Sequence, residues 1–199
     1  GPKADAAITA LLNEANPGRC LAGIRLAGGR GLANARPQLL RNAQAADVAV
    51  RIAALGFLAQ LPSATDIEPI LEILTQANDN GTRQAAEHAL AAAYKADPKG
   101  ETHVPALLKH LQTADAPLKA PLLRLVDGIG GEAARRTLLA AAEDPDAEIR
   151  KSVFRLLAKW TAPEAFPDLF RLAQESPDPT GKLLCLRACI GFVGNQALT

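Results

Sequence analysis

The chain has 199 residues, of which 48% are hydrophobic, enough to form a substantial core. Its 22 Lys and Arg residues nearly balance its 21 Asp and Glu residues, so the net charge of +1 implies no overall attraction to nucleic acid or to an anionic membrane. The three cysteines, Cys20, Cys185 and Cys189, are too few and too scattered for a disulfide framework, and no apolar run has membrane-spanning length. We expect a soluble protein, whose compartment the composition does not indicate.

The first residues are Gly1 and Pro2, and the chain contains no Met. This start resembles the scar left when a purification tag is cleaved. We therefore expect residues 1–199 to be a single repeat domain taken from a longer protein, with residues 1–2 left over from the tag and any native targeting segment outside this fragment.

Basic residues recur along the chain at intervals of 31 to 36 residues. They are Arg19, Arg51, Arg83, Lys119, Arg150 and Lys182. An Asp stands four residues before each of the last five, at Asp47, Asp79, Asp115, Asp146 and Asp178, whereas Asn16 precedes Arg19. A period of this size is typical of solenoid proteins. The Asp suits a helix start, where its carboxylate caps free N–H groups.

Each repeat carries two apolar patterns that fit helices. The first consists of the residues three and seven positions after each basic residue, which share one helical face: Ala22 and Leu26, Ala54 and Leu58, Ala86 and Leu90, Leu122 and Val126, Val153 and Leu157, Cys185 and Cys189. The second lies about 19 residues after each basic residue and is often led by a proline, which the first helical turn tolerates, as at Pro37, Pro69, Pro105 and Pro167.

These patterns predict six helix pairs. In each pair a helix A, which often has a proline in its first turn, is followed by a helix B that starts at the Asp. In chain order, the predicted A and B helices are 4–15 and 17–29, 34–43 and 46–60, 65–77 and 80–95, 102–113 and 116–129, 131–143 and 147–160, and 163–175 and 179–193.

The segments "DVAVRIAALGFL" and "DAEIRKSVFRLL" resemble the HEAT repeat, particularly its bacterial phycobilisome-lyase-like branch. The resemblance covers nearly the whole chain. It implies an all-α, right-handed α-solenoid in which the B helices line the concave side and the Asp and Arg side chains link successive repeats. Many HEAT-repeat proteins are scaffolds or adaptors and a few are enzymes, so the resemblance predicts a surface and not an activity.

A second row of basic residues lies five positions after the recurring basic residue of the repeats, on the solvent side of the B helices. Its members are His88, Arg124, Arg155 and Arg187, and Lys151 and Lys159 flank the same side. Two interpretations remain open for this row. The charges either pair with nearby acidic residues as an ordinary solvated surface, or they form a contact site for an acidic partner.

Catalytic, metal and cofactor sites are not expected. His103 and His110 are seven residues apart, too far for the one-turn spacing of a metal pair. Trp160 and Tyr94 lie near the ends of their B helices, where packing at the edge of the core is the expected role. Aromatic residues make up only 4% of the chain, which argues against stacking on nucleic acid bases.

The sequence therefore predicts a non-catalytic protein-interaction or scaffold module without a cofactor. Its partner is expected to be a protein, not a membrane or a nucleic acid, and that protein is acidic if the basic row is the contact site; the oligomeric state stays open. The alternative is a HEAT-repeat enzyme or nucleic-acid-binding protein, similar to the DNA glycosylases or to the chromophore lyases, that uses the concave groove.

Overall fold

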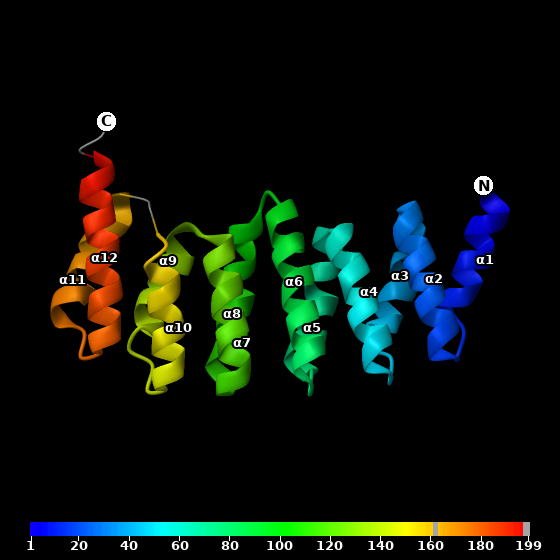
Figure 1. Cartoon of the computed structure of the whole chain (residues 1–199), viewed down its shortest axis with the longest axis horizontal. Helices are drawn as coiled ribbons and strands as arrows, with labels where there is room; N and C mark the ends of the chain where they lie inside the picture. Colours follow the sequence, from blue (N-terminus) through cyan, green and yellow to red (C-terminus); the bar gives the residue numbers. More distant parts are fainter. Residues whose placement is uncertain (161–162, 197–199) are drawn as a thin grey trace. The chain divides into compact units, whose positions relative to one another are not determined.

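The computed structural model describes residues 1–160 and 163–196, and every regular element in this part of the chain is a helix. Twelve α-helices follow one another as six pairs, with short turns between them (Figure 1). The chain divides into two compact units, residues 1–100 and 101–199, each of which contains three pairs. The all-α solenoid predicted from the repeat period is confirmed.

In the first unit, α2, α4 and α6 pack side by side, and each also packs against the odd-numbered helix that precedes it. The second helix of each pair is thereby part of one layer and the first helix part of another (Figure 1). The six helices are α1 (Pro2–Leu12), α2 (Pro17–Arg30), α3 (Arg36–Asn42), α4 (Val48–Gln60), α5 (Ile67–Gln76) and α6 (Asn80–Ala96).

The second unit repeats this arrangement, with α10 packed between α8 and α12. Its helices are α7 (Val104–Thr113), α8 (Ala116–Ile129), α9 (Gly131–Ala141), α10 (Ala147–Leu157), α11 (Phe166–Glu175) and α12 (Pro179–Gln196). The turn from α8 to α9 is very short, and Gly130 and Gly131 take it with φ angles of 75° and 81°, a region that favours glycine.

Each even-numbered helix begins with a side-chain cap, as the Asp series predicts. The capping oxygens accept hydrogen bonds from backbone N–H groups two or three residues later. The pairs are Asn16 with Arg19, Asp47 with Val50, Asp79 with Thr82, Asp115 with Leu118, Asp146 with Glu148 and Ile149, and Asp178 with Gly181.

Four odd-numbered helices begin two or three residues later than predicted, because a 3-10 turn precedes each of them. These turns are Ala33–Ala35, Ala64–Asp66, Gly100–His103 and Pro163–Ala165. The proline is the second residue of α3, α7 and α11 and the third residue of α5. Since the first turn of a helix leaves its N–H groups without intrahelical partners, all four prolines are accommodated there.

The residues three and seven positions after the recurring basic residue are buried in five of the six pairs, as predicted. For the first pair the prediction was wrong. Ala22 and Leu26 are exposed. The cap explains the error, because Asn16 aligns with Asp47 and thereby aligns Cys20, not Arg19, with Arg51. Counted from Cys20, the inward positions are Gly23 and Ala27, and both are buried.

Charged side chains link successive pairs. Arg51 donates from Nη2 to Asp79 Oδ2 at 2.7 Å, from Nε to Thr82 Oγ1 at 3.0 Å, and from Nη1 to two turn carbonyls of its own pair. The hydrogen bonds from Thr82 and Arg51 hold the pKa of Asp79 well below its usual range. In the second unit Lys119 Nζ reaches Asp144 Oδ2 at 2.8 Å, two residues before the cap at Asp146. The Asp–Arg link implied by the HEAT resemblance is therefore present between Arg51 and Asp79, and Lys119 makes a related contact with Asp144.

A second set of ion pairs links the first helix of one pair to the first helix of the next, or to the turn before it, and no pattern in the sequence indicated these contacts. Arg36 pairs with Asp66, and Arg135 pairs with Asp168. Asp66 is only 1% exposed. Burial raises its pKa, while the charge and hydrogen bond of Arg36 oppose that shift.

Candidate protein-interaction surface

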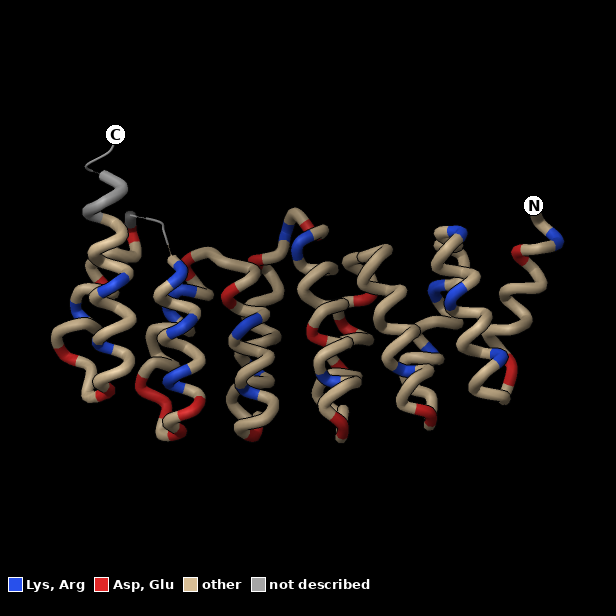
Figure 2. The backbone as a smooth tube through the Cα atoms, viewed as in Figure 1, with Lys and Arg blue, Asp and Glu red and all other residues tan. Residues whose placement is uncertain are grey.

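Three of the predicted basic residues lie on the even-numbered helices of the second unit. Arg124 is on α8, Arg155 on α10 and Arg187 on α12, and all three are exposed as predicted. Because these helices pack side by side, their axes are about 10 Å apart. We call these residues the arginine row. Figure 2 shows basic positions along the even-numbered helices of this unit and acidic positions at the turns where these helices begin.

His88 is also exposed, but it lies on α6 and belongs to the first unit. The equivalent positions in that unit are Arg25 on α2 and Gly56 on α4. Arg25 is exposed and was missed because the first repeat was counted from Arg19. Since glycine interrupts the series at α4, the first unit has no continuous basic row.

Two members of the arginine row have no ion-pair partner in the part of the chain that the structure describes. Within residues 1–160 and 163–196, neither Arg155 nor Arg187 makes an ion pair, whereas Arg124 does interact with another residue. Lys151 pairs with Glu148 over 3.7 Å on the surface, a contact that contributes little. Arg155 and Arg187 therefore do not fit the interpretation that the row only pairs with nearby acids.

A pocket of about 530 Å³ lies between the α8–α9 turn and the segment that leads from α10 to α11. Three apolar residues of its lining, Ala134, Leu138 and Ala165, are buried and each 2% exposed or less. Trp160 forms part of its wall. Charged residues complete the lining: Asp127, Glu132, Arg135, Lys159 and Glu164. We call this cavity the Trp160 pocket.

Hydrogen bonds hold the polar lining of the Trp160 pocket in place. Trp160 Nε1 donates to Asp127 Oδ1 at 2.9 Å. Glu132 accepts hydrogen bonds from Arg135 and Arg136, which lower the pKa of Glu132 to about 2. The half-buried position of Trp160 agrees with the predicted role at the edge of the core, but nothing in its spacing indicated a pocket.

The other candidate residues lie in structural positions. Tyr94 is buried, and that burial raises the pKa of its hydroxyl. Cys185 and Cys189 are buried in α12, where burial and the neighbouring thiol raise the pKa of Cys185 to about 11. A thiol with a raised pKa is a poor nucleophile. His103 and His110 are half-buried, and no group of three candidate metal ligands occurs among the described residues.

In the part of the chain that the structure describes, no helix has the length and apolar character needed to cross a lipid bilayer.

The stacked helix pairs, the capped second helices and the charged links between pairs define a helical-repeat protein of the α-solenoid class. A sequence profile of HEAT repeats matches residues 4–91 and 104–188, which is most of the chain. The protein therefore belongs to the HEAT-repeat family. No curated protein matches its sequence.

Solved structures with the same architecture include designed repeat proteins. An engineered protein from the Northeast Structural Genomics Consortium is 18% identical, with a TM-score of 0.53 over 96% of each chain. Computationally designed armadillo repeat proteins for modular peptide recognition are 15% identical, with a TM-score of 0.53 over 92% of this chain and 98% of theirs. The CpcE–CpcF complex of phycocyanin lyase from Nostoc is 17% identical, with a TM-score of 0.48 over 96% of this chain and 83% of that one. At these identities the similarities to the two designed proteins establish the fold alone.

Proposed function

We propose that the protein is a non-catalytic interaction module whose second unit binds an extended, acidic segment of a partner protein along the arginine row. One observation carries this proposal. Arg155 and Arg187 are exposed on neighbouring helices without an ion-pair partner among the described residues. Guanidinium groups bind carboxylates through paired hydrogen bonds, so such a row offers repeated sites for Asp or Glu side chains.

The spacing of the row fits an extended peptide. Helices packed side by side are about 10 Å apart. An extended chain in the polyproline II conformation has three residues per turn and rises about 3.1 Å per residue, so every third side chain lies on one face about 9 Å from the next. An acidic residue at every third position would therefore meet successive arginines. The designed armadillo proteins of the same fold, which are described as made for modular peptide recognition, support this mode of binding without establishing it here.

The shifted carboxyl pKa values support a structural and not a catalytic role for the acids that carry them. The low pKa of Asp79 arises from a helix cap and from Arg51, and the low pKa of Glu132 arises from Arg135 and Arg136. The pKa of Asp144 is lowered mainly by Lys119, against the opposing effect of burial. Each of these shifts is accounted for by structural contacts, within α9 for Glu132 and between neighbouring pairs for Asp79 and Asp144.

The proposal is tested with a synthetic peptide that carries Glu at every third position between Ser and Gly residues. A second peptide with Gln in place of Glu serves as its control. We expect fluorescence anisotropy to detect binding of the Glu peptide, with affinity that falls as salt is raised, because exposed charges are screened beyond about 8–10 Å at physiological ionic strength. The Gln peptide and duplex DNA are expected to bind at least tenfold more weakly, in line with roughly 1.4 kcal/mol per tenfold change.

Matched variants separate the arginine row from net charge. The row variant combines Arg155→Glu and Arg187→Glu, and the control variant combines Lys109→Glu and Arg171→Glu on the exposed faces of α7 and α11. Both variants change the charge equally. The row variant is expected to lose binding of the Glu peptide while the control variant retains it, with unchanged circular dichroism. Equal affinity of both variants would show that the row is only a solvated surface.

A further inference from the structure

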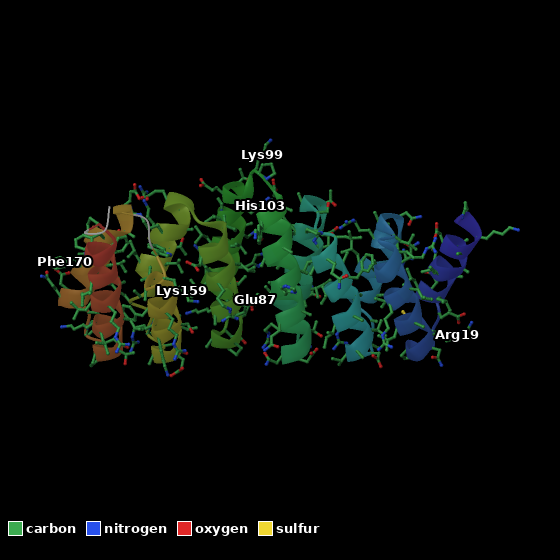
Figure 3. All side chains as sticks on the ribbon, turned by 45° about the horizontal axis from the view of Figure 1, so that its top comes forward. Arg19, Glu87, Lys99, His103, Lys159 and Phe170 are labelled. Carbon is green, nitrogen blue, oxygen red and sulfur yellow. The ribbon has the colours of Figure 1, made fainter. Side chains whose placement is uncertain are left out.

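The Trp160 pocket adjoins the arginine row on the same two helices. Asp127 follows Arg124 by three residues on α8, and Lys159 follows Arg155 by four residues just beyond the end of α10. Residues with these spacings share a helix face, and the rise of a helix places them about 5–6 Å apart along its axis. Figure 3 labels Lys159 beside the yellow ribbon of α10. The rim of the pocket is therefore about one helical turn from the row.

The chemistry of the pocket differs from that of the row. Its ionisable lining consists of three carboxylates, Asp127, Glu132 and Glu164, and two cations, Arg135 and Lys159. Arg135 is already engaged by Glu132 and by Asp168. A second acidic side chain would meet more negative than positive charge here, so the pocket does not simply extend the basic surface.

The uncharged part of the lining favours an apolar group. Trp160 is half-buried and offers part of its aromatic ring, and the residues packed behind the lining, Ala134, Leu138 and Ala165, are apolar. Because the indole N–H already donates to Asp127, the ring position is set before any ligand arrives, which reduces the entropy lost on binding. A volume of about 530 Å³ is within the usual range for ligand pockets, so a large side chain fits.

We propose that the Trp160 pocket receives a bulky apolar or aromatic side chain of the same segment whose acidic residues lie on the arginine row. This inference rests on the proposed function and adds a sequence requirement to it. A separation of about 5–6 Å corresponds to roughly two residues of extended chain. The partner segment therefore carries a Phe-like or Leu-like residue about two positions from an acidic one, so that the row supplies charge selectivity and the pocket sets the register.

Trp160 is the only tryptophan of the chain, so its fluorescence reports on the pocket directly. The probes are three synthetic peptides: the Glu peptide with Phe two residues from one Glu, the same peptide with Ala in place of Phe, and the Phe peptide with Gln in place of every Glu. The first is expected to bind roughly tenfold or more tightly than the second, because burying a Phe side chain contributes that much. Only the two peptides that contain Phe should shift the emission of Trp160. The one with Gln in place of Glu should need a much higher concentration to do so.

Two variants make the assignment specific. Trp160→Ala removes the wall of the pocket, and Phe170→Ala removes an aromatic ring that is 45% exposed on α11, away from the pocket (Figure 3). Labelled-peptide anisotropy is expected to show that Trp160→Ala abolishes the preference for Phe over Ala while Phe170→Ala retains it. If Trp160→Ala does not fold, Asp127→Ala takes its place. This variant keeps the tryptophan but removes the acceptor of the indole N–H, and it is expected to weaken the preference for Phe over Ala.

The outcomes separate this inference from the proposed function. Equal, salt-sensitive binding of the Phe and Ala peptides to the unaltered protein would overturn the pocket assignment and leave the arginine row in place. A preference for Phe that persists in Trp160→Ala would also overturn the pocket assignment. Failure of all three peptides to bind would overturn both proposals.

Discussion

At the scale of single residues, one side-chain oxygen starts each even-numbered helix. Asp146 illustrates this, because its Oδ1 accepts the backbone N–H groups of Glu148 at 2.8 Å and Ile149 at 3.4 Å. The same position is filled by Asn16 in the first pair, which shows that the cap and not the negative charge is the shared requirement. Asp79 adds a second function, since it also accepts a hydrogen bond from Arg51 of the preceding pair.

Replacing Asp146 with Ala should lower the free energy of unfolding by about 0.5–2 kcal/mol, because the first turn of α10 loses its cap. Urea denaturation followed by circular dichroism measures the loss. The neighbouring change Glu148→Ala is the control, since Glu148 is exposed and makes only a 3.7 Å surface contact with Lys151. An Asp146→Ala protein as stable as the control, but unable to bind the acidic peptide, would assign Asp146 to the binding surface.

At the scale of helices, the contact between α10 and α12 depends on a large side chain of one helix that packs against a glycine of the other. Phe154 is completely buried, and its ring occupies the space that a Cβ atom at Gly181 would need. Glycine at this position therefore lets α12 approach α10 closely. Gly56 in α4 differs, because a Cβ atom there would meet nothing within 4 Å.

The two glycines should respond to alanine with opposite signs. Gly181→Ala is expected to lower the free energy of unfolding by about 1–3 kcal/mol, because the new methyl group overlaps the Phe154 ring. Gly56→Ala is expected to raise it by about 0.4–1 kcal/mol, because alanine restricts the unfolded chain and favours the helix. Paired urea melts decide the matter, and a neutral Gly181→Ala would contradict the close approach of the two helices.

At the scale of the whole molecule, the packing connects neighbours in sequence. Within the second unit α10 contacts α8, α9 and α12, and α11 packs mainly on α12. In such arrays stability is close to a sum of the stability of each repeat and the interfaces between nearest neighbours. Loss of one terminal repeat should therefore weaken the remainder without unfolding it.

A chain that ends at Trp160, without α11 and α12, should remain helical and melt cooperatively at a lower temperature than the chain of 199 residues. The loss in stability arises in part because Phe154, which is 0% exposed in the complete chain, would become accessible to water. Circular dichroism per residue and thermal melting test this expectation. A truncated chain without helical signal would mean that the repeats fold only as one indivisible unit.

Local chemistry in the sequence was enough to predict the helices and the exposed arginines. Asp47, Asp79, Asp115 and Asp146 were recognised as helix starts because capping involves residues only a few positions apart. The prolines marked the preceding helices for the same reason, although the 3-10 turns in front of them were not visible. The first repeat was misaligned because a basic residue, Arg19, happens to lie one position before the true equivalent, Cys20.

By itself, therefore, the sequence determined the repeat class, the helix pairs and the exposure of Arg124, Arg155 and Arg187, since periodicity and capping act within a few turns of one helix. Tertiary structure alone decided which charges meet, as in the pair of Arg36 with Asp66, and which elements form the Trp160 pocket. The physical reason is distance along the chain. Trp160 and Asp127 are separated by 33 residues and come together only when α8 and α10 pack side by side, which no local pattern encodes.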